Sequence, residues 1–262
     1  MRHIPRKRFG QNFLVDTQVV ADIIFAIHPA KDGLLVEIGP GLGALTRPLL
    51  QSLNHLHVVE IDRDIVERLR REFPAERLTV YSADALEFDF SVLGNNLRVV
   101  GNLPYNISTP ILFHLSSFAA NITDMHFMLQ KEVVARMVAA PSTSDYGRLS
   151  VMLQCRFEME QLFSVPPESF RPVPKVESAI VRMSPLRQAL IEPGKEKLFA
   201  KIVAAAFSQR RKTLRNTLHG HLKPEDYVAL EIDPGLRAEN LSVAQFVAIT
   251  NRLSGLFSPD GA

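Results

Sequence analysis

Short apolar runs alternate with stretches of helical periodicity along the first half of the chain. After the runs at 34–38 and 57–61, apolar side chains recur at the spacing of one helix face. The same succession continues further along. Runs of this kind lie at 34–38, 57–61, 78–81, 97–100 and 125–129. Repeated strand-to-helix passes predict a mostly parallel sheet with helices on both faces.

A helix is predicted before the first of these strands. Asp16 or Thr17 can cap its beginning, apolar residues from Val19 to Ile27 follow at helical spacing, and Pro29 ends it.

The pattern changes after Pro141. Two further strand-like runs lie at 157–165 and 176–183, and a stiff loop with four prolines separates them at 166–174. From these two runs we expect the sheet to end in an antiparallel pair.

Only helical patterns remain near the end of the chain, at 197–207, from about Thr213, and at 242–253. We therefore expect an α/β, Rossmann-like domain over residues 1–185 and a small all-α domain over residues 186–262.

Composition is that of an ordinary globular protein. The 262 residues are 46% hydrophobic, which is enough for one large and one small core. The first residues lack the apolar segment of a secretory signal, and no apolar run approaches the length of a membrane span, so we expect a cytoplasmic protein. The single cysteine, Cys155, excludes an internal disulfide and is expected to be a buried, inert thiol.

Charge is informative through its distribution, because the net charge is only +2. Basic residues gather in the first eight positions and again near residue 210. The second cluster consists of Arg210, Arg211, Lys212 and Arg215. Both clusters can contact a polyanion, although either one alone is also typical of a solvated surface.

A glycine turn follows the run at 34–38. Gly39, Gly41 and Ala44 satisfy a dinucleotide-type fingerprint, and Glu60 ends the next strand about 20 positions later, where a carboxylate can accept hydrogen bonds from both hydroxyls of a ribose. A generic tight turn and a solvated acid are the simpler alternatives, but neither explains the spacing. Asp84 follows the third strand, where it can bind an adenine amine or simply cap a helix. Together these residues predict an adenosine-containing cofactor.

The stretch Asn102-Leu103-Pro104-Tyr105 follows the fourth strand of the predicted sheet. Pro104 restricts its own backbone and that of Leu103, so the Leu103 carbonyl is held beside the Asn102 side chain. Two fixed hydrogen-bond acceptors beside the aromatic ring of Tyr105 suit a flat ring that carries an amine, such as a nucleobase.

These acceptors suggest transfer of a methyl group onto nitrogen. An exocyclic base amine is a poor nucleophile until hydrogen bonds draw it towards tetrahedral geometry, after which it can attack a sulfonium methyl without a strong base or a metal. The eight histidines form no pattern of metal ligands. Phe170, in the proline-rich loop, is the candidate second stacking ring beside Tyr105, and its alternative role is an anchor in the core.

The motifs taken together resemble the KsgA/RsmA-type ribosomal RNA adenine N6-dimethyltransferases, relatives of the erythromycin-resistance rRNA methyltransferases and of mitochondrial transcription factor B. Their order along the chain is that of the family. The motifs are Lys7-Arg8-Phe9-Gly10-Gln11-Asn12-Phe13-Leu14, Glu37-Ile38-Gly39-Pro40-Gly41-Leu42-Gly43, Glu60-Ile61-Asp62, Asp84-Ala85, Asn102-Leu103-Pro104-Tyr105-Asn106-Ile107-Ser108, Phe170-Arg171-Pro172-Val173-Pro174-Lys175-Val176-Glu177-Ser178 and Gln209-Arg210-Arg211-Lys212-Thr213-Leu214-Arg215-Asn216.

This resemblance implies a class I S-adenosylmethionine-dependent methyltransferase fold and S-adenosylmethionine as the methyl donor. The acceptors it implies are two adjacent adenosines near the 3′ end of small-subunit rRNA, each dimethylated during subunit maturation by a monomeric enzyme. The N-terminal motif is expected to cover the donor, and the C-terminal helices with their arginines are expected to dock on rRNA. By resemblance the donor site contains Gln11, Asn12, Leu14, Gly39, Gly41, Glu60, Asp84 and Asn102.

Three other interpretations remain open. A resistance-type enzyme acting on large-subunit rRNA is the nearest, and the Gly10-Gln11 pair and the long match at 170–178 argue against it by resemblance. A non-catalytic assembly or transcription factor with this fold would not need Asn102 and Glu60. A dehydrogenase is the least favoured, because no acid or base for hydride transfer is evident.

Overall fold

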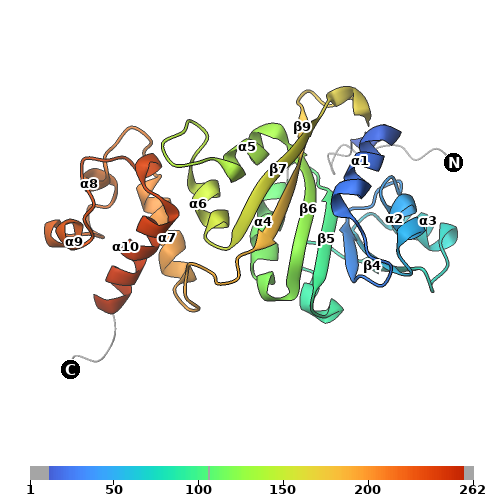
Figure 1. The fold of residues 1–262 in the computed structure, drawn as a ribbon, viewed down its shortest axis with the longest axis horizontal. Coiled ribbons are helices and arrows are strands. Elements are labelled where there is room, and N and C mark those ends of the chain that lie inside the picture. Colours follow the sequence, from blue (N-terminus) through green and yellow to red (C-terminus); the bar gives the residue numbers. More distant parts are fainter. Residues whose placement is uncertain (1–11, 106, 257–262) are drawn as a thin grey trace. The chain divides into compact units, whose positions relative to one another are not determined.

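The computed structural model describes residues 12–105 and 107–256, and among these seven strands form one sheet (Figure 1). The strand order is β4-β3-β2-β5-β6-β9-β7. Neighbours among the first five strands are parallel. These five are β2 (Leu35–Ile38), β3 (Leu56–Glu60), β4 (Leu78–Ser82), β5 (Leu97–Asn102) and β6 (Ile122–Gln130). All four residues of β2 are buried, which explains why this interior strand is a mostly apolar run rather than an alternating pattern.

Helices follow β2, β3, β5 and β6, as predicted, but β4 is connected to β5 by a 3₁₀ turn and no α-helix, so the predicted helix there is not found. Asp16 caps the first helix by accepting the N–H groups of Gln18 and Val19, and the helix ends at His28, whose φ of 48° is left-handed. The helices of this part are α1 (Thr17–Ile27), α2 (Thr46–Ser52), α3 (Arg63–Glu72), α4 (Ser108–Ser116) and α5 (Lys131–Val138), with 3₁₀ turns η2 (Phe90–Leu93) and η3 (Ala119–Asn121).

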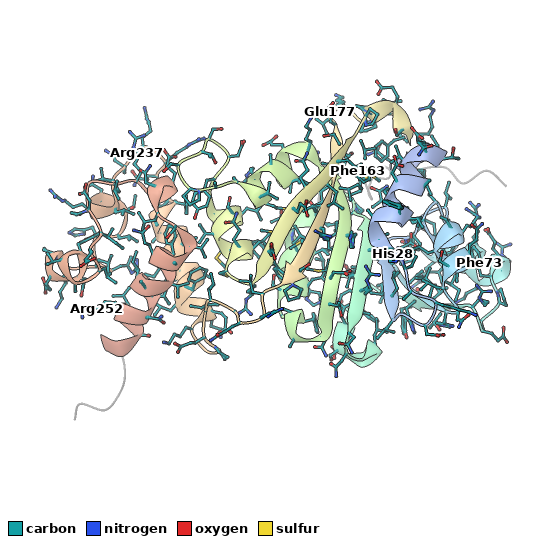
Figure 2. The ribbon with its side chains drawn as sticks, viewed as in Figure 1. His28, Phe73, Phe163, Glu177, Arg237 and Arg252 are labelled. Atoms are coloured by element: carbon teal, nitrogen blue, oxygen red, sulfur yellow. The ribbon has the colours of Figure 1, made fainter. Side chains whose placement is uncertain are left out.

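The last strands make the sheet mixed, and the predicted fold class is confirmed. β9 (Ser178–Pro185) runs antiparallel to β6, with Met125 opposite Met183, and β7 (Phe157–Val165) pairs with the other edge of β9. Glu177, labelled in Figure 2, lies just before β9 and forms an ion pair with Lys131 at 2.7 Å.

A second, two-stranded sheet was not predicted. β1 (Phe13–Leu14) pairs antiparallel with β8 (Phe170–Arg171), and the 3₁₀ turn η4 (Pro167–Ser169) leads into β8. The register places Phe13 opposite Arg171 and Leu14 opposite Phe170. The N-terminal motif and the proline-rich loop are therefore directly hydrogen-bonded partners.

The described residues divide into two compact units. One contains the residues up to 134 together with 159–185, and the other contains 135–158 together with those from 186 onward. The sequence-based boundary at residue 185 places residues 135–158 in the first domain, whereas the structure groups them with the second unit. These residues join the second unit because Tyr146 and Cys155 are buried in the same core cluster as Phe199 and Phe246.

The second unit is helical. Its elements are α6 (Arg148–Gln154), α7 (Glu196–Ala206), α8 (Leu214–Thr217), α9 (Pro224–Ala229), η5 (Ala238–Asn240) and α10 (Val243–Leu256). Arg252 on α10 bonds to the buried Asp226 of α9 at 3.0 Å (Figure 2). Across the described residues, no helix is both long enough and apolar enough to span a membrane.

Candidate active site

A cavity of about 420 Å³ lies at the carboxyl edge of the parallel strands in the first unit. Residues that follow β2, β3, β4 and β5 line it, and the N-terminal segment 12–15 forms a further wall. The chain crosses from β2 to β3 on one side and returns to β5 on the other, so this edge is a topological switch point. Such a point is where open α/β sheets bind ligands.

The glycine turn forms one side of the cavity. Gly39 and Gly41 have φ values of 64° and 53°, a left-handed conformation that side chains rarely tolerate. The N–H of Gly39 donates to the carbonyl of Val59 at 3.0 Å, which ties the turn to β3. A Cβ at Gly41 would lie 3.2 Å from the ring of Phe13, so glycine also allows the N-terminal segment to approach.

Glu60, at the end of β3, is only 6% exposed and lines the cavity. Burial raises the pKa of its carboxyl group, while N–H groups of Asp62, Gly41 and Ile61 oppose that rise. The N–H of Asp62 donates to Oε1 at 2.9 Å. The carboxylate is therefore fixed beside the glycine turn, and its role as the acceptor of two ribose hydroxyls stays a prediction.

Asp84 also lines the cavity, and Oδ1 accepts the N–H of Leu86 at 2.9 Å. One of its oxygens therefore closes a turn at 85–87, and the helix that the alternative interpretation expected it to cap does not form. The residue lies on the cavity wall, so closing this turn is compatible with the predicted contact to an adenine amine.

Asn102 lies at the opposite side of the cavity, at the end of β5. β5 approaches β2 so closely that a Cβ at Gly101 would lie 2.6 Å from the carbonyl oxygen of Ile38. The Nδ2 of Asn102 donates to the carbonyl oxygen of Asn12 at 3.2 Å. Since the amide nitrogen is used here, the Asn102 side chain has its oxygen left as an acceptor.

The residues after Asn102 are fixed by further hydrogen bonds. The N–H of Leu103 donates to Met128 on β6 at 3.2 Å, and the Ser108 hydroxyl donates to the carbonyl of Tyr105 at 3.1 Å. The Tyr105 hydroxyl is 2.8 Å from Oγ of Ser178. Burial raises the pKa of Tyr105, so its ring is a neutral surface on the cavity wall.

Phe170 is not brought to the cavity, which corrects its expected position. Its side chain is 0% exposed and belongs to the core cluster that includes Leu14, Val100 and Met128. Pairing of β8 with β1 places Phe170 opposite Leu14, and its buried position fits the alternative interpretation of a core anchor, while the stacking role stays a prediction. Gln11 and the basic residues at the start of the chain lie outside the described residues.

The second basic cluster lies in the second unit. Arg210 donates to the carbonyl of Ser144 at 2.9 Å and lies 3.6 Å from Glu239, so it is partly engaged within that unit. Arg211, Lys212 and Arg215 are exposed.

Glu37 is a cavity residue to which the sequence analysis assigns no role. It is 2% exposed, and the Thr46 hydroxyl donates to Oε2 at 2.6 Å. Burial raises its pKa to about 7, with Glu60 adding to the rise and Thr46 and Arg47 opposing it. The available signal was an acidic residue inside the otherwise apolar run Leu35-Val36-Glu37-Ile38. Among the described residues, no group of three or more His, Cys, Asp or Glu side chains is arranged to hold a metal ion.

We compared the chain with models of known protein families and with related sequences. A family model described as "Ribosomal RNA adenine dimethylase" matches residues 2–254. The chain belongs to this family. Ribosomal RNA small subunit methyltransferase A of Nitrosospira multiformis is 74% identical over 251 residues, covering 96% of this chain and 97% of the relative. The protein of the same name from Nitrosomonas europaea is 64% identical over 253 residues, covering 97% and 98%.

Solved structures agree with a dimethylase fold. A dimethyladenosine transferase from Plasmodium falciparum matches with a TM-score of 0.80 at 24% identity, covering 92% of this chain and 98% of that one. The 23S rRNA methyltransferase ErmE matches with a TM-score of 0.71 at 26% identity, covering 93% and 100%. The first of these likenesses concerns the fold alone.

Replacing Phe170 tests its place in the core. We expect Phe170→Ala to lower the free energy of unfolding by about 3–5 kcal/mol, because a fully buried ring is lost, and Phe170→Leu to restore most of it. Urea unfolding measures both. Wild-type stability of Phe170→Ala would contradict the core role. Turnover of the folded Leu variant separates packing from stacking, because leucine fills the core but offers no ring.

Glu37→Gln tests the raised pKa. Between pH 4.5 and about 7 the folded protein keeps a proton that the unfolded chain has lost, so this residue makes the fold less stable as the pH rises through that window. Glutamine does not titrate. Relative to wild type, the variant should therefore gain about 3 kcal/mol between pH 4 and 8, measured by urea unfolding. Glu76→Gln, at an exposed position, is the control, and an equal pH profile for both variants would refute the assignment.

Proposed function

We propose that this protein transfers methyl groups from S-adenosylmethionine to N6 of two adjacent adenosines near the 3′ end of small-subunit rRNA, giving N6,N6-dimethyladenosines during ribosome biogenesis. One observation carries the proposal. A single cavity contains a glycine turn with Glu60 on one side and Asn102 to Tyr105 on the other. Membership in the rRNA adenine dimethylase family and the 74% identity to a small-subunit methyltransferase support it.

The cavity residues fit the proposed donor. Two buried carboxylates, Glu37 and Glu60, line the cavity, and such groups suit a ligand that carries positive charge. When bound, S-adenosylmethionine supplies a methyl group on a positively charged sulfur. Glu60 would accept the ribose hydroxyls, Asp84 the adenine amine, and the backbone at Gly39 and Gly41 would allow close approach. Asn12 and Leu14 would form the wall that covers it, completed by Gln11.

Asn102 and its neighbours would activate the target amine. Oδ1 of Asn102 and the carbonyl of Leu103 each accept one N–H, which localises the nitrogen lone pair for in-line attack. Pro104 keeps these two acceptors together. A strong base is unnecessary, because the nitrogen becomes cationic on methylation and then loses its proton readily.

The base must first leave its stack, at a cost of about a few kcal/mol, and stacking on an aromatic ring can return about 1–3 kcal/mol. Tyr105 lies on the cavity wall and is the ring available for this contact. Phe170 would have to leave its core position before it could act as a second stacking ring.

Dimethylation requires the same two acceptors to work twice. In the second round the amine has only one N–H left to share between Asn102 and Leu103. The pocket must then accommodate a methyl group where a hydrogen bond was, and stacking by Tyr105 contributes more to positioning.

The partner we propose is small-subunit rRNA, within an immature small subunit in the cytoplasm. We assign methyl transfer to residues 1–185 and rRNA docking to residues 186–262, acting as a monomer. The exposed cations of the second unit, Arg211, Lys212 and Arg215, support the docking role, because most affinity for nucleic acid comes from phosphate contacts.

Mapping of methylated adenosines tests the activity. Undermethylated small subunits incubated with the protein and donor should give primer-extension stops at two adjacent adenosines near the 3′ end.

Asn102→Ala should lower the rate of methylation by on the order of 100- to 1,000-fold, because one acceptor for the amine is missing. Calorimetry should show that Asn102→Ala keeps most of the affinity for S-adenosylmethionine. Stops in large-subunit rRNA only would favour the resistance-type activity, and wild-type turnover by Asn102→Ala would refute the acceptor role.

The salt dependence of binding tests the docking surface. Replacing Arg211, Lys212 and Arg215 by Gln should weaken binding to small-subunit rRNA and reduce the slope of log Kd against log salt by about 2–3, one phosphate contact each. The control replaces three other exposed cations of the same unit, Arg187, Lys197 and Lys201, and so changes the net charge equally. Equal slopes for both triple variants would place the RNA surface elsewhere.

A further inference from the structure

The wall of the cavity formed by residues 12–15 is attached to the 3₁₀ turn η4 within the proline-rich loop. Ser169, in η4, is 2% exposed and makes three hydrogen bonds, one to Val15 at the end of this segment and two to the following residue, Asp16. Its carbonyl accepts the N–H groups of Val15 at 2.9 Å and Asp16 at 3.3 Å, and its hydroxyl donates to Oδ2 of Asp16 at 2.9 Å. Ser169 therefore binds both the backbone and the side chain at the end of this wall.

Asp16 has two separate partners. Oδ1 caps α1 by accepting the N–H groups of Gln18 and Val19, whereas Oδ2 accepts the Ser169 hydroxyl. Hydrogen bonds from Val19 and Ser169 lower the pKa of Asp16, so the bond to Ser169 is made to a charged acceptor. Oδ1 therefore caps α1, and Oδ2 forms the hydrogen bond between Asp16 and Ser169, which we call the link.

The other end of the wall reaches Asn102. The carbonyl oxygen of Asn12 can only accept a hydrogen bond, so it selects the orientation in which Asn102 directs Nδ2 towards it, at 3.2 Å. A half-turn of the Asn102 amide would instead direct N–H groups at an incoming amine, which also presents N–H groups. Whether Asn102 presents its oxygen or its nitrogen to the incoming amine therefore depends on where the Asn12 carbonyl is held.

We propose that Ser169 is a positioning residue for methyl transfer. Through Asp16 and the pairing of β1 with β8, it holds residues 12–15 so that the Asn12 carbonyl keeps the oxygen of Asn102 as the acceptor for the amine. The inference rests on the proposed acceptor role of Asn102. Ser169 and Asp16 are not among the residues that line the cavity, so their effect on the reaction is transmitted through the wall.

Three variants test the link in steady-state methylation of undermethylated small subunits. Ser169→Ala removes the hydroxyl. Asp16→Ser keeps a good cap for α1 but is too short to reach Ser169. Each should lower kcat about tenfold, the effect of losing one hydrogen bond to a charged group, and raise the Kd for the donor by only about threefold. The double variant should lose no more than either single one, because both remove the same bond.

Ser91→Ala is the matched control. Ser91 also donates its hydroxyl to an aspartate that caps a helical turn, Asp89 before η2, and neither residue lines the cavity. Because Ser91 is exposed, Ser91→Ala should reduce stability by less than Ser169→Ala does, and it should leave kcat unchanged. If Ser169→Ala changes kcat no more than Ser91→Ala does, or if the two link variants are additive, the positioning role is wrong.

A readout without turnover distinguishes this inference from the proposed function. The side-chain amide of Asn102, identified in ¹⁵N NMR spectra by its loss in Asn102→Ala, should exchange its protons with solvent at least about tenfold faster in Ser169→Ala, because the bond to Asn12 is weakened. Unchanged exchange would overturn the positioning role even if Asn102 is essential. Active Asn102→Ala with faster exchange in Ser169→Ala would instead overturn the acceptor role and leave the link intact.

Discussion

The close approach of β2 and β5 is the constraint on which the site depends. The backbone at Gly101 is so near the carbonyl of Ile38 that no side chain fits between them. This contact brings the turn that follows β2 and the Asn102 stretch that follows β5 to the same cavity. In the proposed reaction, one strand end would hold the donor and the next would hold the acceptor, so the sheet would fix their separation, which is the preorganisation that transfer between two bound substrates needs.

The cavity also contains two buried acidic side chains. Glu37 and Glu60 are both buried, burial raises the pKa of each, and Glu60 adds to the rise at Glu37. Without a positive ligand this arrangement opposes stability, which is typical of residues kept for binding rather than for folding. The hydroxyl of Thr46 and the N–H groups around Glu60 reduce that cost and fix where the two carboxylates point.

Most of the fold could be predicted because its signals are local. Buried parallel strands give continuous apolar runs, and the residues at their ends share one edge, so Gly39, Glu60 and Asn102 could be placed together from the sequence. Pairing of β1 with β8 could not, since each strand has only two residues and no periodicity reveals a two-residue strand. From the sequence without that pairing, Phe170 looks like an aromatic residue of an exposed loop rather than a core residue. The inclusion of 135–158 in the second unit also depends on distant packing, around Tyr146 and Cys155.

The pairing of β1 with β8 also sets an order of events during synthesis. Residue 13 leaves the ribosome early, but its partner is Arg171, which is made only after every parallel strand of the sheet. The glycine turn and Asn102 can therefore reach their places while one wall of the cavity still lacks its support. The wall at 12–15 therefore gains its pairing partner only when the proline-rich loop is made, after the parallel strands of the sheet have been synthesised.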